Sequence, residues 1–114
     1  MDYSIRECGS VAIIDVAGDL DKSATDVLEF ALTSLAVRGK NRVVLNLANV
    51  DFICSTSLGM VGRFYRRLQR AGGALVLLQP TDNVRRVITI TRLCELIRIV
   101  DTESQAVAEA GGNG

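Results

Sequence analysis

The sequence predicts an α/β fold in which helices pack on a small mixed β-sheet. Short apolar runs rich in β-branched residues alternate with segments of helical periodicity, in the order β-β-α-β-α-β-α-β-α. Such alternation is typical of a mainly parallel or mixed sheet covered by helices. With 114 residues, of which 48% are hydrophobic, the chain can form one core. We predict a single domain over residues 1–110 and a disordered tail over residues 111–114.

The first predicted elements are two strands and a helix. We expect Tyr3–Glu7 to pair with Val11–Ala17 through a short turn that contains a glycine. Apolar residues recur at helical spacing across Ser23–Arg38, which predicts a helix with one apolar face. Its N-terminus is expected to be capped by Asp21 or Ser23, because a short polar side chain there accepts a hydrogen bond from a free backbone N–H.

The rest of the chain contains three more strands and three more helices. The strands are predicted over Arg42–Leu47, Ala74–Leu78 and Leu96–Val100. The first of these is almost wholly apolar, which indicates burial on both faces of the sheet. One helix should follow the hydroxyl cluster at residues 55–57 and end at the glycines at residues 72–73. A third is opened by Thr81 or Asp82, and a short last helix starts within residues 101–104.

The helix after the hydroxyl cluster has two different faces. Its predicted core face carries Leu58, Val61, Tyr65 and Leu68, and its other face carries Arg63, Arg66, Arg67 and Arg70. We interpret the arginine face as solvated, since cations near a helix C-terminus also complement the helix dipole.

Composition excludes several classes of function. Thirteen basic and thirteen acidic residues give no net charge, so we predict no direct nucleic-acid partner. The absence of histidine removes the commonest general base and metal ligand, and three scattered cysteines have no metal-ligand spacing. We expect no metal, no cofactor and no catalytic residue. No segment is typical of a signal peptide or of membrane insertion, and we predict a cytoplasmic protein.

The cluster Ser55-Thr56-Ser57 stands between a buried strand and a helix, and it has two interpretations. A hydroxyl there can cap the helix. Alternatively, one hydroxyl is phosphorylated, because a helix N-terminus accommodates the charge of a phosphate. The neighbouring Cys54 offers a separate possibility, a redox-sensitive thiol, since thiols at helix N-termini can have a lowered pKa.

Several segments of the chain resemble the STAS domain family, the single-domain anti-sigma factor antagonists of bacterial partner-switching systems. The turn Gly18-Asp19-Leu20-Asp21 is similar to the family's Gly-Glu-Leu-Asp turn. Leu45-Asn46-Leu47 followed by Val50-Asp51-Phe52-Ile53 is similar to its central strand and turn, and Pro80 with Val84-Arg85-Arg86-Val87 to its third-helix segment. The resemblance extends from about Tyr3 to Ala108.

The family's loop reads Asp-Ser-Ser/Thr-Gly-Leu-Gly, and its first hydroxyl is a kinase target. The resemblance therefore implies Ser55 as the phosphorylation site, with Thr56 as the second choice. Cys54 stands where the family has aspartate, and Ser57 where it has glycine, which limits any backbone geometry with positive φ at that position. The expected partner-binding residues are Asp19, Asp21, Cys54, Ser55, Thr56, Ser57 and Gly59.

The resemblance also implies a mechanism without catalysis by this chain. The unphosphorylated protein would bind an anti-sigma factor that has serine kinase activity, phosphorylation at Ser55 would dissociate the complex, and a serine phosphatase would reverse it. The alternative is a constitutive STAS interaction subunit of a stressosome-type or ABC lipid-transport complex.

Overall fold

The computed structural model describes residues 1–111 and confirms the predicted α/β class. The strands are β1 (Asp2–Cys8), β2 (Val11–Ala17), β3 (Arg42–Asn49), β4 (Ala74–Leu78) and β5 (Arg98–Val100). The helices are α1 (Lys22–Val37), α2 (Ser55–Arg70), α3 (Asp82–Ile90), the 3₁₀ turn η1 (Leu93–Glu95) and α4 (Glu103–Ala110). Of the predicted tail, residues 112–114 lie outside the described part of the chain.

The five strands form one mixed sheet in the order β1-β2-β3-β4-β5. β1 pairs antiparallel with β2, whereas the pairs β2–β3, β3–β4 and β4–β5 are parallel. Each parallel pair is connected through a helix that packs back on the sheet, as crossover connections require. The carboxyl ends of β2, β3 and β4 therefore lie at one edge of the sheet, where the following helices begin.

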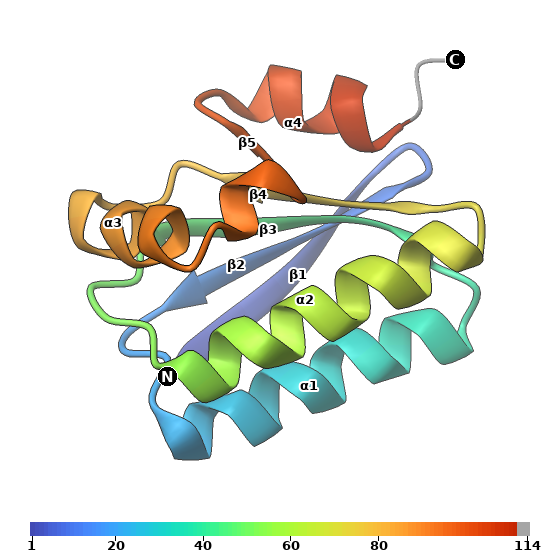
Figure 1. Cartoon of the computed structure of the whole chain (residues 1–114). Helices are drawn as coiled ribbons and strands as arrows, with labels where there is room; N and C mark the ends of the chain where they lie inside the picture. The colour runs from blue at the N-terminus through green and yellow to red at the C-terminus, as the bar shows by residue number, and fades with distance from the viewer. Residues whose placement is uncertain (112–114) are drawn as a thin grey trace.

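Helices cover both faces of the sheet. Figure 1 shows α1 and α2 side by side on one face and the shorter α4 on the other. β3 confirms the prediction of burial on both faces: Val43, Leu45 and Leu47 belong to the large cluster under α1 and α2. Val44 belongs to the smaller cluster under α4. Burial of this strand explains why its sequence is a continuous apolar run.

The structure corrects the last predicted strand. β5 contains only Arg98–Val100, because the backbone before it forms the turn η1. The N–H groups of Leu96 and Ile97 donate to the carbonyl of Leu93, each at 2.9 Å, and so are not available to a strand ladder. Arg92, in the left-handed region at φ 64°, starts this turn. A local turn thus replaces the first half of the predicted strand.

α2 presents its arginines to solvent, as predicted. Arg63, Arg66, Arg67 and Arg70 are all exposed. The guanidinium of Arg67 lies 5.4 Å from the centroid of the Phe64 ring, which is 5% exposed. The side chain of Arg67 therefore also covers part of the core by a cation–π contact. No helix in residues 1–111 combines the length and the apolar character needed to cross a membrane.

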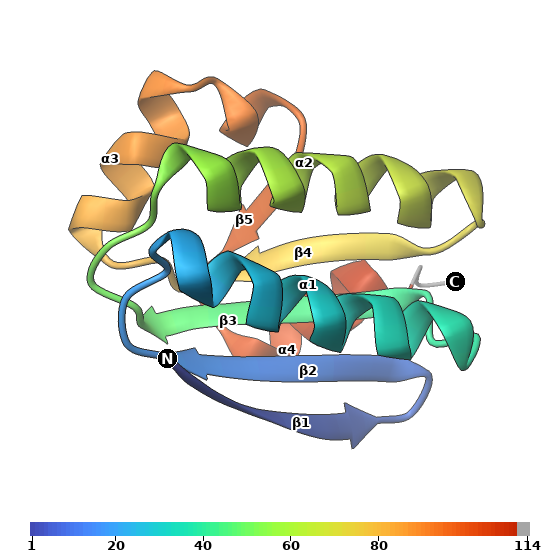
Figure 2. The same cartoon turned by 90° about the horizontal axis from the view of Figure 1, so that it is seen from below.

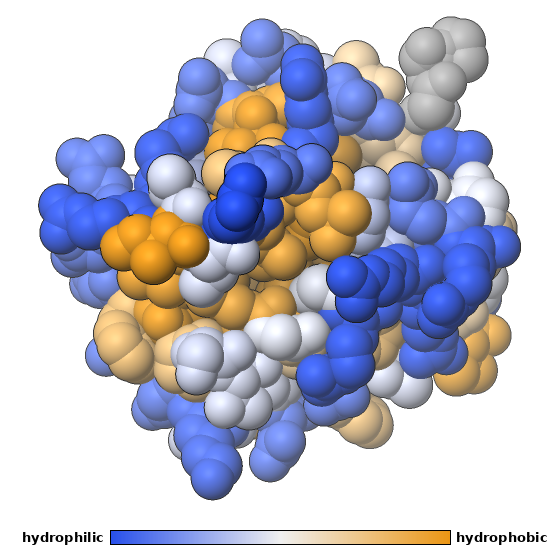
Figure 3. Space-filling view, viewed as in Figure 1, coloured by the Kyte–Doolittle hydropathy of each residue, from blue (hydrophilic) through white to orange (hydrophobic). Residues whose placement is uncertain are grey.

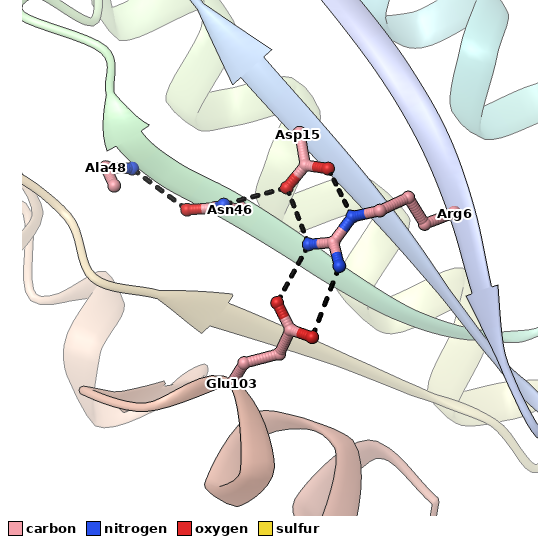
Figure 4. A network of polar contacts seen from close by, with 5 residues as sticks. All are labelled: Arg6, Asp15, Asn46, Ala48 and Glu103. Atoms are coloured by element: carbon pink, nitrogen blue, oxygen red, sulfur yellow. Dashed lines mark hydrogen bonds and ion pairs between the residues drawn. The ribbon is translucent and has the colours of Figure 1, made fainter.

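A polar network ties α4 to the sheet (Figure 4). The Arg6 guanidinium on β1 donates to both carboxylate oxygens of Asp15, at 2.6 and 3.0 Å. It also donates to both oxygens of Glu103 on α4, at 3.2 and 2.8 Å. Asn46 on β3 donates to Asp15 at 2.8 Å and accepts from the N–H of Ala48 at 3.1 Å. One arginine thus joins the edge strand to the last helix.

The network makes the domain more sensitive to acid. The hydrogen bonds from Arg6 lower the pKa of Asp15 and the pKa of Glu103 below their ordinary values. A carboxyl group with a lowered pKa binds fewer protons when folded, so its stabilisation is present above the unfolded pKa of about 4 and is lost as pH falls through the folded value. We expect Glu103→Gln to melt below the unsubstituted protein at neutral pH, and the difference to shrink under acid. Thermal melts across a pH series measure this, and a difference independent of pH would contradict it.

Candidate functional site

The candidate site lies at the carboxyl ends of β2 and β3, where two loops meet. The N–H of Leu20 donates to the carbonyl of Phe52 at 2.8 Å, and the N–H of Cys54 donates to the carbonyl of Leu20 at 2.9 Å. Leu20 and Ile53 also form an isolated parallel bridge and are both buried. These backbone contacts fix the loop before α1 against the loop before α2. Residues from both loops consequently share one surface.

Asp21 caps α1, which confirms one of the two predicted caps. Its carboxylate accepts from the N–H of Ala24 at 2.9 Å and from the hydroxyl of Ser23 at 3.0 Å. These two hydrogen bonds lower the pKa of Asp21. Both Asp21 and its neighbour Asp19 are exposed, so each can also contact another molecule.

The predicted hydroxyl cap of α2 is wrong. The helix begins at Ser55, and its N-cap is Cys54, which makes no side-chain capping hydrogen bond. Ser55, Thr56 and Ser57 therefore occupy the first three helical positions, all of them past the capping position. Side-chain oxygens cap α1, α3 and α4, so among the four α-helices of residues 1–111 α2 alone has no such cap.

The three hydroxyls face different environments. Ser55 and Thr56 are exposed, whereas Ser57 is 0% exposed. Ser57 belongs to the predicted partner-binding set, and its burial corrects that prediction: no partner can reach its hydroxyl in this structure. Its backbone is helical rather than of positive φ, so serine is compatible with the position that is glycine in the family's loop.

Ser57 instead joins α2 to α1. Its hydroxyl hydrogen-bonds with the hydroxyl of Thr25, and its oxygen also lies 3.3 Å from the carbonyl oxygen of Leu20. Thr25, 3% exposed, in turn donates to the carbonyl of Asp21 at 3.0 Å. Buried hydroxyls need such partners, because an unpaired buried polar group costs about 1–3 kcal/mol. The pair holds the N-terminal ends of the two helices together beneath the exposed hydroxyls.

Cys54 is half-buried next to this pair. Burial raises the pKa of its thiol, but contacts with the hydroxyls of Ser57 and Thr25 and with the backbone at Ser57 and Thr56 together lower it more. The Sγ atom lies 3.6 Å from Ser57 Oγ and 3.9 Å from Thr25 Oγ1. The net effect is a pKa below the ordinary value of a cysteine.

The lowered pKa predicts a distinct alkylation profile for Cys54. Its thiolate should persist to a lower pH than an ordinary thiol's, so its rate of reaction with iodoacetamide should fall at lower pH than an unperturbed cysteine predicts. Site-resolved mass spectrometry across a pH series measures this, with Cys8 and Cys94 in the same chain as exposed internal references. Three coincident pH profiles would contradict these contacts. The Ser57→Ala substitution removes the contact with the Ser57 hydroxyl and should shift the Cys54 profile to higher pH.

Two residues of the site are absent from the set predicted from the sequence. Phe52 is 50% exposed on the loop before α2, where a large aromatic side chain is available for contact. The sequence feature that could have identified Phe52 is an aromatic residue inside a loop, in a chain with only five Phe and Tyr residues. Thr25 is the second residue absent from the predicted set. The sequence feature that could have identified it is a hydroxyl residue next to the apolar face of α1. Gly59 is exposed on the second turn of α2, and a Cβ added there would meet the guanidinium of Arg63 at 3.7 Å.

No group of three or more potential metal-ligating side chains occurs within residues 1–111. A hollow of about 240 Å³ lies elsewhere, at the β4–β5 edge, lined by Tyr65, Leu96, Arg98 and Glu109 among others. Figure 3 shows apolar surface gathered on that side of the molecule. None of the candidate site residues lines this hollow.

Comparison with known proteins assigns the family. A family model described as the STAS domain matches residues 2–106. A relative from Thermotoga neapolitana, named as an anti-sigma factor antagonist, is 36% identical over 75 residues, 66% of this chain and 66% of the relative. The anti-sigma-B factor antagonist of Staphylococcus aureus is 30% identical over 86 residues, 75% of this chain and 80% of the relative.

Solved structures agree with this assignment. The crystal structure of an anti-sigma factor antagonist from Thermotoga maritima has a TM-score of 0.89 and 25% identity, over 96% of this chain and 94% of that one. The unphosphorylated form of the antagonist SpoIIAA has a TM-score of 0.82 over 97% of each chain, and at 22% identity it shows the shared fold alone. The chain therefore belongs to the STAS domain family, and the relatives it matches are named anti-sigma factor antagonists.

Proposed function

We propose that this chain is an anti-sigma factor antagonist that binds an anti-sigma factor with serine kinase activity. Phosphorylation of Ser55 by that partner ends binding, and a serine phosphatase restores it. The chain itself contributes a binding surface and a phosphoacceptor rather than a catalytic group.

The observation that carries this proposal is the N-terminus of α2. Ser55 is exposed at its first helical position, and no side-chain oxygen occupies the capping place. The first turn also contains no acidic residue. The positive end of the helix dipole can therefore receive phosphate oxygens. A phosphate at Ser55 adds about two negative charges without a need to refold the helix.

The neighbouring hydroxyls rank below Ser55. Thr56 is exposed and remains the second choice. Ser57 is 0% exposed and pairs with Thr25, so a kinase would have to unfold the first turn of α2 to reach it. Exposure therefore reduces three consecutive candidates to two, and the order of residues in the family's loop favours the first.

The binding surface consists of exposed or half-buried residues around the phosphoacceptor. It comprises Asp19, Asp21, Phe52, Cys54, Ser55, Thr56 and Gly59. Phe52 supplies apolar contact area near the centre, and the two aspartates supply charge at the side of α1. A dianion at Ser55 would be desolvated in the interface with the partner. Charges that are buried without a partner cost several kcal/mol, which is enough to dissociate the complex.

Incubation with the cognate kinase and ATP tests the proposal. Intact-mass and peptide mass spectrometry should find one phosphate, located on the peptide that contains Ser55. The Ser55→Ala variant should take up none, whereas Thr56→Ala should be phosphorylated as the unsubstituted protein is. A chain that binds the anti-sigma factor but is never phosphorylated would overturn the switch and leave a constitutive binding protein.

A further inference from the structure

The outer face of α1 carries three large apolar side chains that nothing in residues 1–111 covers. Phe30 is 69% exposed, Val37 is 77% exposed and Val27 is 44% exposed. The buried residues of α1 lie on the opposite side, against the sheet: Ala24, Thr25, Leu28, Ala31, Leu32 and Leu35. Figure 2 shows α1 lying on the sheet beside α2. Large apolar groups this exposed are typical of an interaction surface when they form a stripe rather than stand singly.

The three exposed apolar residues and the half-buried Ser34 are spaced for contact with a second helix. Val27, Phe30, Ser34 and Val37 are separated by three, four and three residues, which is the spacing of a seam between two packed helices. In an antiparallel pair of α1 helices centred on Leu32, Val27 of one copy faces Val37 of the other. The same alignment places Phe30 opposite the small Ser34, which leaves space for the ring.

Charges at the two ends of the stripe complement each other in the same arrangement. Asp26 lies near the start of α1 and Arg38 at its C-cap, so antiparallel pairing places each Asp26 beside the other copy's Arg38. Asp26 takes part in no ion pair within residues 1–111. The guanidinium of Arg38 lies 3.9 Å from the carboxylate of Glu7, near the limit for an ion pair. The ammonium of Lys40 lies closer to that carboxylate, at 2.9 Å. Asp26 and the exposed, weakly paired Arg38 can thus both contact a second copy.

We propose that the outer face of α1 is a self-association surface, on which two copies of this chain pack antiparallel about a two-fold axis. An isologous contact of this kind uses each residue twice, which suits a stripe with opposite charges at its ends. Tyr3 and Ile5, 37% and 38% exposed, lie on the face of the sheet that α1 covers and add apolar area at its side. A single helix pair buries less surface than the roughly 1,200 Å² or more that is buried in stable complexes. The dimer is therefore weak and reversible.

Sedimentation velocity over a range of concentrations tests the dimer. From about 1 µM to about 1 mM, the weight-average sedimentation coefficient should rise from the monomer value toward the dimer value. Phe30→Glu should raise the dissociation constant of the dimer by about tenfold or more, because it puts a charge at the centre of the contact. The matched control is Ile90→Glu, since Ile90 is 72% exposed on α3, away from α1, and this substitution should leave association unchanged.

Charge reversal tests the antiparallel arrangement itself. Asp26→Arg alone and Arg38→Asp alone should each weaken self-association, because both create like-charge pairs. An equimolar mixture of the two variants should associate again, since each mixed dimer contains two opposite-charge pairs. A protein that stays monomeric up to about 1 mM overturns the proposal. The proposal is also overturned if the mixture associates no better than either variant alone. It is overturned as well if the protein is monomeric and Phe30→Glu instead weakens binding of the anti-sigma factor.

Discussion

Ser55→Ala is expected to bind the anti-sigma factor permanently, whereas Ser55→Glu binds it weakly. Alanine cannot accept phosphate, so incubation with ATP should leave its affinity for the kinase unchanged. Glutamate places a carboxylate at the first position of α2, in the middle of the proposed interface. A desolvated charge there should raise the dissociation constant by about a hundredfold, which corresponds to about 2.7 kcal/mol. Isothermal titration calorimetry with the cognate kinase measures both variants.

The matched control is Thr56, one position further along the same helix turn. Thr56→Ala should bind and dissociate as the unsubstituted protein does, because Ser55 remains available to the kinase. Ser55→Glu must also keep its melting temperature, since an acidic residue in the first turn of a helix is favourable by about 0.3–1 kcal/mol. Equal affinities of Ser55→Ala and Ser55→Glu for the kinase would refute the switch.

Aspartate substitutions at the three consecutive hydroxyls should have very different effects on stability. Ser55→Asp and Thr56→Asp place the charge in solvent at a helix N-terminus, so their melting temperatures should stay the same or rise. Ser57→Asp places it where the native hydroxyl is 0% exposed and already paired with Thr25. Burial of a charge without a counter-ion should cost about 3 kcal/mol or more, or a fall of more than about 10 °C in melting temperature.

Chemical denaturation of the same three variants provides the free energies. Ser57→Ala separates the effect of the charge from that of the lost hydroxyl, and should cost about 1–2 kcal/mol because Thr25 keeps its contact with the carbonyl of Asp21. If Ser57→Asp were as stable as Ser55→Asp, the first turn of α2 would open readily. In that case Ser57 would return to the set of phosphorylation candidates.

The sequence already contained a signal for the burial of Ser57. The residues at positions 57, 61, 64 and 68 recur at helical spacing, and Val61, Phe64 and Leu68 are all buried. Extending the apolar face of α2 by one turn toward its N-terminus therefore reaches Ser57. The predicted core face begins one residue later, at Leu58, because a serine at a helix N-terminus can equally be a capping residue. Hydroxyl residues are ambiguous in this way, because their side chains can hydrogen-bond either to the free backbone groups of a helix end or to a buried group of another helix.

The sequence by itself determined the order of strands and helices, the burial of β3 on both faces, a cap of α1 at Asp21 or Ser23 and the exposed arginines of α2. These follow from periodicity and from local hydrogen bonds, which act between residues close in the chain. Only the tertiary structure decided the order of strands in the sheet and which hydroxyls of the cluster are exposed. It also placed Thr25 on Ser57, 32 residues away, and Arg6 on Glu103, 97 residues away. Such contacts depend on how the helices dock on the sheet, and no local pattern specifies that docking.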